Sequence, residues 1–176
     1  MYYHKVTIYT AFRNNGLQVD TVLDCQFTKC YLLYVNEHYN FFIIIFIANV
    51  MSKKIVNTVH APEAIGPYSQ AVVHNNTVYC SGQIALDAAS MQVVEGGIEE
   101  QTRLVMNNIG TVLKEAGSNF SKVLKCSIFL DDMNDFPKVN EIYGSYFDSE
   151  PPARETVAVK TLPKNVLIEI SCIAYI

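Results

Sequence analysis

Arg154 is the first candidate for a functional residue in this sequence. It lies in the stretch PPARETVAV at positions 151–159. It is one of only three arginines in the chain, and it follows a rigid Pro-Pro pair at the start of a strand-like run. An arginine offers a planar fork of donors that binds a carboxylate through two parallel hydrogen bonds. This placement indicates a fixed anchor for a carboxylate.

A second candidate is Glu169, which stands between Ile168 and Ile170 in an otherwise apolar segment. A carboxylate in such a position can orient or deprotonate a water molecule. Arg154 and Glu169 could instead form a structural salt bridge, and their spacing alone leaves both interpretations open.

Two further stretches could line a site near these residues. The stretch AIGPYSQA at 64–71 is typical of a turn, and it presents Tyr68. The stretch SGQ at 81–83 follows a strand-like run, and the small residues Ser81 and Gly82 would let backbone N–H groups approach a ligand. Tyr68 could also be a packing residue, and SGQ could be an ordinary strand end.

Composition and motifs exclude several other classes of function. The net charge is −4 and the pI is about 5.5, so the chain as a whole does not attract phosphate backbones. The sequence contains no GxSxG, P-loop or GxGxxG motif. It contains no HExxH motif and no Cys/His cluster, so we expect no metal site.

The five cysteines indicate the redox compartment. Their number is odd and none of them forms a CxxC pair, which favours buried free thiols in a reducing compartment over a disulfide framework. We therefore expect a cytoplasmic protein, and the sequence leaves the choice between cytosol and mitochondrion open.

The chain changes character at Met51. Residues 1–50 contain no proline and end in an apolar run, of which 41–47 is far shorter than the roughly 20 residues that a membrane helix needs. Residues 51–176 contain all six prolines and show regular periodicity. We expect residues 1–50 to be an extension outside the functional fold, for which a translated leader is one interpretation, and residues 51–176 to be the functional domain.

Periodicity within this domain predicts an α+β fold. Its order is ββαβαββ, with both helices on one face of a sheet. We expect strands at 71–74, 77–84, 122–130, 154–159 and 167–175, a helix at 98–116, and a second helix that opens at Asn134 as N-cap and carries the apolar stripe Phe136, Val139, Tyr143 and Phe147. Few positions on the uncovered face are charged, so we expect self-association through that face.

Five stretches connect this domain to a known family. In chain order they are AIGPYSQA, YCSGQI, DDMNDFPKVNEIYGSYF, PPARETVAV and LPKNVLIEISCIA. On these stretches, residues 51–176 resemble over their whole length the Rid family of reactive intermediate deaminases, also called YjgF. Residues 1–50 lie outside the resemblance.

The resemblance implies a chorismate-mutase-like (YjgF-like) fold and a homotrimer with three clefts between subunits. It also implies hydrolysis of 2-iminoacids or their enamines, notably 2-iminobutanoate and 2-iminopropanoate, to 2-oxoacids and ammonia. These small molecules are reactive products of pyridoxal-phosphate dehydratases, and the family removes them without a cofactor or a metal.

The resemblance also assigns roles to residues. Arg154 would bind the substrate carboxylate, Glu169 would position the attacking water, and the cleft would be lined by Tyr68, Ser81, Gly82 and Asn140. The sequence departs from the family at Thr156, where several members carry a cysteine, so thiol reactivity is lost there. It departs again at Pro151, where an aromatic residue is common.

Two alternatives to the imine deaminase stay open. One is an RNA-cleaving inhibitor of translation, against which the acidic charge and the lack of an aromatic-basic stripe count. The other is a non-catalytic metabolite-binding or chaperone-like module on the same scaffold. Neither the preferred imine nor a partner dehydratase follows from the sequence.

Overall fold

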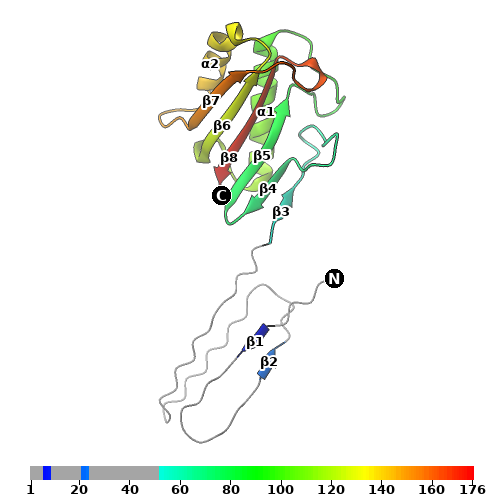
Figure 1. Cartoon of the computed structure of the whole chain (residues 1–176), viewed down its shortest axis with the longest axis vertical. Coiled ribbons are helices and arrows are strands. Elements are labelled where there is room, and N and C mark those ends of the chain that lie inside the picture. Colours follow the sequence, from blue (N-terminus) through cyan, green and yellow to red (C-terminus); the bar gives the residue numbers. More distant parts are fainter. Residues whose placement is uncertain (1–5, 9–20, 24–51) are drawn as a thin grey trace, which may run out of the picture. The chain divides into compact units, whose positions relative to one another are not determined.

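The computed structural model describes residues 6–8, 21–23 and 52–176 (Figure 1). The chain divides into two compact units, Met1–Met51 and Ser52–Ile176. In the first unit, β1 (Val6–Ile8) pairs antiparallel with β2 (Thr21–Leu23). The apolar run at 41–47 lies outside the described residues. Within the described part, no helix is both long enough and apolar enough to span a membrane.

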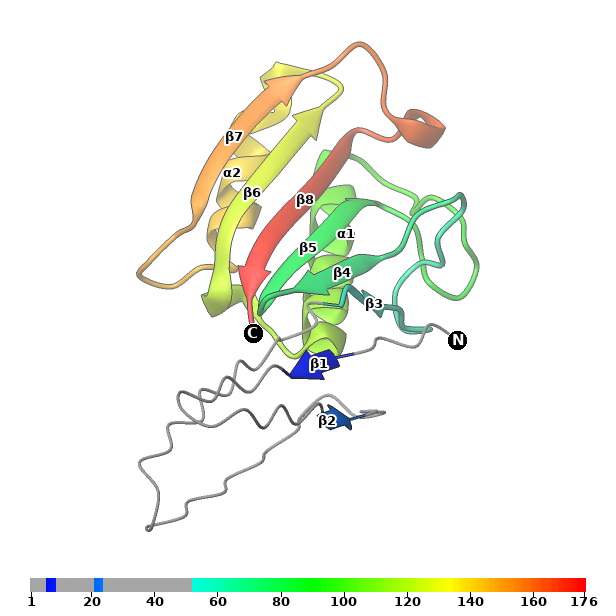
Figure 2. The ribbon, with the colours of Figure 1, turned by 60° about the horizontal axis from the view of Figure 1, so that its bottom comes forward.

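The second unit is a six-stranded sheet with two helices on one face, which confirms the predicted α+β class (Figure 2). In spatial order the strands are β3 (Lys54–Val56), β4 (Ala71–His74), β5 (Thr77–Ile84), β8 (Ile168–Tyr175), β6 (Val123–Leu130) and β7 (Ala153–Ala158). Only β6 and β7 are parallel. The helices are α1 (Ile98–Ala116) and α2 (Phe136–Gly144), and 3-10 turns lie at Phe120–Lys122, Met133–Asp135 and Pro163–Asn165.

Two details differ from the prediction. The edge strand β3 was not expected, because three residues are too few to show an alternating pattern. The predicted N-cap Asn134 instead lies inside the 3-10 turn Met133–Asp135, where its backbone N–H donates to Asp132 Oδ1 at 2.9 Å. Helix α2 therefore has Asp135 as its N-cap and begins at Phe136, one residue later than expected.

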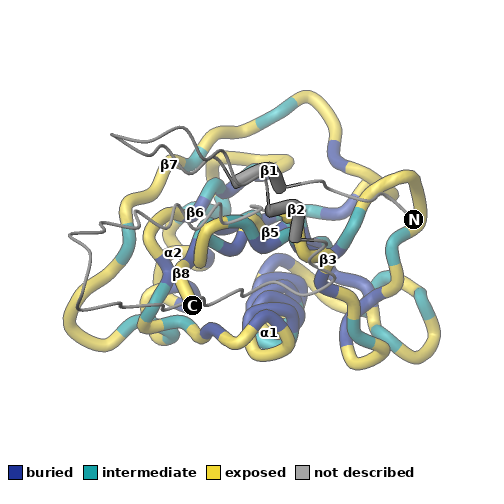
Figure 3. The backbone as a smooth tube through the Cα atoms, turned by 90° about the horizontal axis from the view of Figure 1, so that it is seen from below, coloured by how far each residue is buried: buried dark blue, intermediate teal, exposed yellow. Residues whose placement is uncertain are grey.

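Helix α1 supplies most of the helical half of the core. It begins after Gly97, whose N–H donates to Glu100 Oε2 at 2.9 Å, and it ends at Gly117 with φ of 86°, a left-handed conformation that glycine adopts without strain. Figure 3 shows it dark blue on the side that faces the sheet and yellow on its outer side. Its fully buried side chains include Val105, Met106, Ile109, Val112 and Leu113.

Three thiols form a row across the middle of the sheet on its helix-covered face. Cys80 is the register partner of Cys172, and Cys172 is the register partner of Cys126. All three are buried and free, as predicted, and burial raises the pKa of Cys126 to about 11. All three side chains are buried among apolar neighbours, so these cysteines act as core residues. Cys25 and Cys30 lie outside the described residues.

Helix α2 owes its place to the parallel pairing of β6 and β7. Parallel neighbours cannot be joined by a tight turn and need a crossover, and α2 is the crossover here. The crossover packs back over the two strands that it joins. As a result, side chains of α2 lie over the first residues of β7.

A β-bulge interrupts the pairing of β5 with β8. Cys80 pairs with Cys172 and Gln83 with Ile170, so Ser81 and Gly82 together stand opposite one residue of β8. Such bulges re-aim side chains and are frequent beside active sites. The bulge lies in the SGQ stretch that the sequence singles out.

The face of the sheet away from the helices is only partly apolar. It exposes Tyr79, Val157 and Tyr175 by 49%, 44% and 45%. Two charged side chains on this face, Lys125 and Glu155, form an ion pair. Lys125 lies on β6 and Glu155 lies on the neighbouring β7, so the two charges compensate each other.

Candidate active site

Arg154 lies at the start of β7 and faces the helices. Its register partner is Cys126, which is buried under the helical layer. Its Nη1 donates to Asn140 Oδ1 at 2.8 Å. Its guanidinium carbon lies 5.3 Å from the ring centroid of Phe136 and 5.0 Å from that of Tyr143. The structure thus brings the two predicted site residues Arg154 and Asn140 into direct contact.

Thr156 extends this group by two positions along the same face of β7. Its register partner is the buried Ile128. The Thr156 Oγ1 atom is buried and has no hydrogen-bond partner in the described part of the chain. A buried hydroxyl without a partner is costly, and a ligand could reach this atom only if the side chains that cover it moved.

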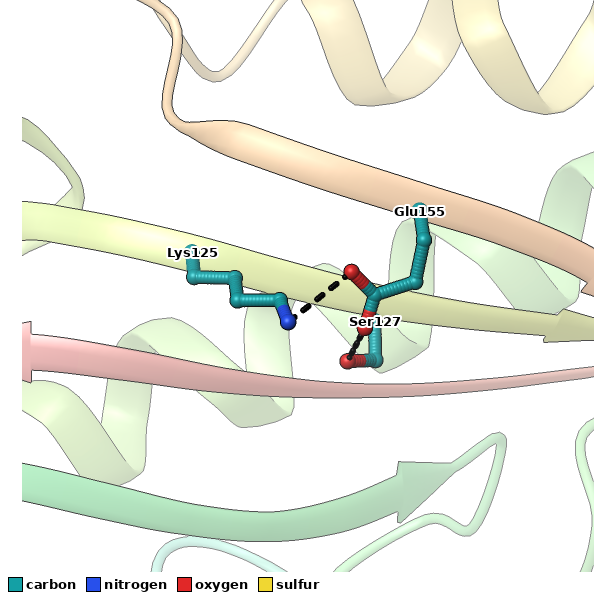
Figure 4. A network of polar contacts seen from close by, with 3 residues as sticks. All are labelled: Lys125, Ser127 and Glu155. Atoms are coloured by element: carbon teal, nitrogen blue, oxygen red, sulfur yellow. Dashed lines mark hydrogen bonds and ion pairs between the residues drawn. The ribbon is translucent and has the colours of Figure 1, made fainter.

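The neighbour Glu155 points to the opposite face and is already engaged (Figure 4). Its Oε2 lies 3.0 Å from Lys125 Nζ, and its Oε1 accepts a hydrogen bond of 2.5 Å from Ser127 Oγ. These contacts, the Ser127 bond first, lower the pKa of Glu155. The alternation along β7 therefore separates a structural charge at Glu155 from the charge at Arg154.

Arg154, Asn140 and Thr156 form one group of candidate residues, which we call the Arg154 group. Glu169 lies in a second group at the bulge, with Ser81, Gly82 and Tyr68, which we call the Glu169 group. A Cβ atom on Gly82 would clash with Glu169 Oε1 and Cδ, so the carboxylate lies directly over the Gly82 backbone. Burial raises the pKa of Glu169 above the ordinary glutamate value. A carboxylate with a raised pKa is a stronger base once it has lost its proton. Only glycine at position 82 leaves room for this arrangement.

Ser81 and Tyr68 are tied together beside that carboxylate. The backbone N–H of Ser81 donates to the Gln70 carbonyl at 3.0 Å, and its hydroxyl donates to the Ser69 carbonyl at 2.7 Å. Tyr68 is 47% exposed at the end of this segment. The hydroxyl proton of Ser81 is thus used inside the protein, and the residue holds the segment that presents Tyr68.

Gln70 anchors the other side of the same loop, and sequence reasoning missed it. Its side chain is 1% exposed; Oε1 accepts from Thr58 N at 2.7 Å, and Nε2 donates to the Pro62 carbonyl at 2.7 Å. A glutamine beside a turn motif gives no signal of this role, because its partners are backbone groups up to 12 residues away.

The two groups do not meet within one chain. Arg154 pairs with Cys126 on the helix face, whereas Glu169 pairs with Phe129 on the opposite face. Their strands lie on either side of β6, about 10 Å apart. The structural salt bridge between Arg154 and Glu169 is therefore not formed, and the ion pair found within residues 52–176 is Lys125–Glu155.

Two hollows on the described surface are each an incomplete site. The one that contains Tyr68 and Gly82 has a volume of about 20 Å³, room for a single water molecule. A larger hollow of about 150 Å³ lies over β5, β6 and β8, between Lys125 and Ser171, and none of the predicted site residues lines it. A substrate held by one group alone would remain largely in solvent.

Known proteins share both the sequence and the fold. The sequence profile of the family described as Endoribonuclease L-PSP matches residues 58–176. A RutC family protein of Synechocystis is 49% identical over 126 residues, which cover 70% of this chain and 97% of that protein. The 2-iminobutanoate/2-iminopropanoate deaminase of Bos taurus is 48% identical over 122 residues, which cover 69% of this chain and 89% of that protein.

A solved structure agrees with this relationship. The crystal structure of E. coli TdcF with bound serine has a TM-score of 0.67 and 36% identity, and the match covers 70% of this chain and 98% of that chain. The profile match spans well over half of the chain, and it contains every candidate residue from Tyr68 to Glu169. The chain therefore belongs to the Endoribonuclease L-PSP family, the Rid or YjgF family that its sequence resembles.

Proposed function

We propose that the protein hydrolyses 2-iminoacids, such as 2-iminobutanoate and 2-iminopropanoate, to 2-oxoacids and ammonia. The observation that carries the proposal is the state of Glu169: its carboxylate is partly buried, has a raised pKa and forms no ion pair with Arg154. A structural carboxylate would be paired, as Glu155 is. The 48% identity to a deaminase of this name supports the same conclusion.

The chemistry needs one anchor and one base. Arg154 binds the substrate carboxylate through the donors that Asn140 does not use. Glu169 takes a proton from water as the oxygen attacks the imine carbon, and the C=N bond becomes a C–N bond. Glu169 passes that proton to the nitrogen, which gives a carbinolamine with a hydroxyl and an NH2 group on the same carbon. The hydroxyl proton then moves through Glu169 to the nitrogen, the C–N bond breaks, and ammonia leaves as the carbonyl forms. The net reaction consumes one water for each ammonia released.

A working cleft requires two copies of the chain in this proposal. The anchor and the base lie on opposite faces of the sheet, so one substrate molecule cannot contact both within one copy. We propose that a cleft forms where the Arg154 group of one copy meets the Glu169 group of the next. The exposed Tyr79, Val157 and Tyr175 would be covered in the same assembly.

We expect a homotrimer in solution. Light scattering coupled to size exclusion should give a mass three times the 19.8 kDa of one chain. The family resemblance supplies the number three, and a closed ring leaves no unpaired interface. A monodisperse monomer at micromolar concentration would contradict both the assembly and the shared cleft.

The direct test couples the protein to a threonine dehydratase, which releases 2-iminobutanoate. The protein should accelerate the decay of the imine above its spontaneous rate, with matching release of ammonia and 2-oxobutanoate. No acceleration with any 2-iminoacid would exclude the deaminase and leave the metabolite-binding alternative. Salt-dependent binding and cleavage of RNA by the pure protein would instead favour an endoribonuclease, the activity that the family description names.

We further propose that residues 1–50 are dispensable for this function. The family profile begins at residue 58, and the residues assigned to the cleft all follow it. A chain that begins at Met51 should fold, stay soluble and turn over imine at the rate of the full chain. An unfolded or inactive shortened chain would show that the extension is part of the fold.

A further inference from the structure

Helix α2 presents three residues to Arg154 from one face. Phe136, Asn140 and Tyr143 are spaced i, i+4 and i+7, which places them in a row along one side of a helix. All three contact the guanidinium, two by their rings and one by its amide oxygen. We infer that this row, the α2 bed, is a positioning device that holds Arg154 ready for a carboxylate. The inference rests on the proposed function.

The geometry suits a held cation. Both ring centroids lie within the roughly 6 Å over which an aromatic face attracts a guanidinium. The amide atom of Asn140 that meets Nη1 is its oxygen, since an arginine has no acceptor to offer an NH2 group. Asn140 therefore acts through Arg154, as well as lining the cleft.

The α2 bed leaves most hydrogen-bond donors of Arg154 free for a substrate carboxylate. A guanidinium has five N–H donors, and Asn140 takes one of them. Arg154 stands on an edge strand and is exposed, so without the bed its side chain would sample several rotamers. A fork that is already oriented loses less entropy when it binds a carboxylate in two places. The α2 bed thus contributes to affinity without contacting the reacting atoms.

The test uses the full chain with Phe136→Leu, Asn140→Ala and Tyr143→Leu. Each variant should raise KM by about three- to ten-fold and change kcat by less than about two-fold, because the bed serves binding of the carboxylate. Tyr146→Leu is the matched control. Tyr146 lies two residues beyond the end of the helix and packs against Phe120, away from Arg154. Tyr143 is buried, so should its variant fail to fold, the partly buried Phe136 and the exposed Asn140 still decide the matter.

A second measurement does not depend on activity. The chain has only three arginines, so the ¹⁵Nε–H signal of Arg154 can be assigned by comparison with Arg154→Lys. Its order parameter should fall in the three bed variants and stay unchanged in Tyr146→Leu. Tyr143→Phe keeps the ring and should keep the order of the arginine.

Double-mutant cycles complete the design. In an Arg154→Ala background, Phe136→Leu and Asn140→Ala should no longer change KM, because the residue through which they act is missing. An unchanged arginine order parameter in the bed variants, or effects on KM that persist without Arg154, would overturn the inference. If the protein does not hydrolyse imines, only the proposed function fails. The order parameter of Arg154 still shows whether the α2 bed holds the guanidinium in place.

Discussion

Arg154→Ala is expected to lower kcat/KM for 2-iminobutanoate by about 30-fold to several thousand-fold, which is the range for loss of one partner of a desolvated charge pair. The variant removes the proposed anchor of the substrate carboxylate. It should leave the fold intact, since Arg154 is exposed and its contacts are confined to α2. Steady-state kinetics together with light scattering would separate loss of activity from loss of assembly.

Two further variants make the result specific to this guanidinium. Arg154→Lys should recover little activity, because an ammonium group cannot form the two parallel hydrogen bonds of a guanidinium. Arg103→Ala removes an exposed arginine of α1 and should behave as the parent protein. Normal turnover in both Arg154 variants would remove this residue from the mechanism.

Glu169→Gln is expected to lower kcat by about 10²- to 10⁴-fold, the usual contribution of a general base, with a smaller effect on KM. Glutamine keeps the shape over Gly82 but cannot take a proton from water. In the parent protein, kcat/KM should fall as the pH drops through the raised pKa of Glu169. That acid limb should therefore lie above the ordinary range of a glutamate and should be missing in the variant.

Stability gives an independent check on the same carboxylate. Burial raises the pKa of Glu169 in the folded state, so folding favours its protonated form. The stability from this group is fully present below the unfolded-state pKa and is lost as the pH rises through the folded-state pKa. Glu169→Gln should therefore be at least as stable as the parent at pH 7, by thermal unfolding. A clear drop in the melting temperature would point to a structural role instead.

The two inactive variants also test where the cleft lies. If each cleft takes Arg154 from one copy and Glu169 from another, mixed assemblies of Arg154→Ala and Glu169→Gln chains should regain activity. Random mixing restores about a quarter of the clefts in a closed ring. Refolding the variants together and assaying the mixture measures this directly. A cleft within a single chain would give no recovery.

Local patterns in the sequence were enough to predict most of the elements. Alternation and helical periodicity placed α1 at its observed bounds and placed five strands within one residue of theirs. These signals are local, since each element repeats its own pattern over many residues. The short β3 was not predicted because three residues show too little pattern. The start of α2 was misplaced because Asp132, and not Asn134, caps the turn that precedes the helix.

The sequence by itself also singled out the residues that we propose for the chemistry. The rarity of arginine, the rigid Pro-Pro approach to Arg154 and the lone charge of Glu169 in an apolar strand are properties of the chain alone. The sequence could not decide how these two residues lie relative to each other in space. It was compatible with Arg154 as a substrate anchor and Glu169 as a base, and also with a salt bridge between them.

Only the tertiary structure decided that relation, because strand register and strand order depend on contacts between distant residues. The pairing of β7 with β6 turns Arg154 toward the helices, and the pairing of β8 with β5 turns Glu169 to the other face. The bulge at Ser81 and Gly82 exists only against β8, and the α2 bed exists only because a parallel pair requires a crossover helix. The sequence thus identified the candidate groups, and long-range pairing decided that they lie on opposite faces of the sheet.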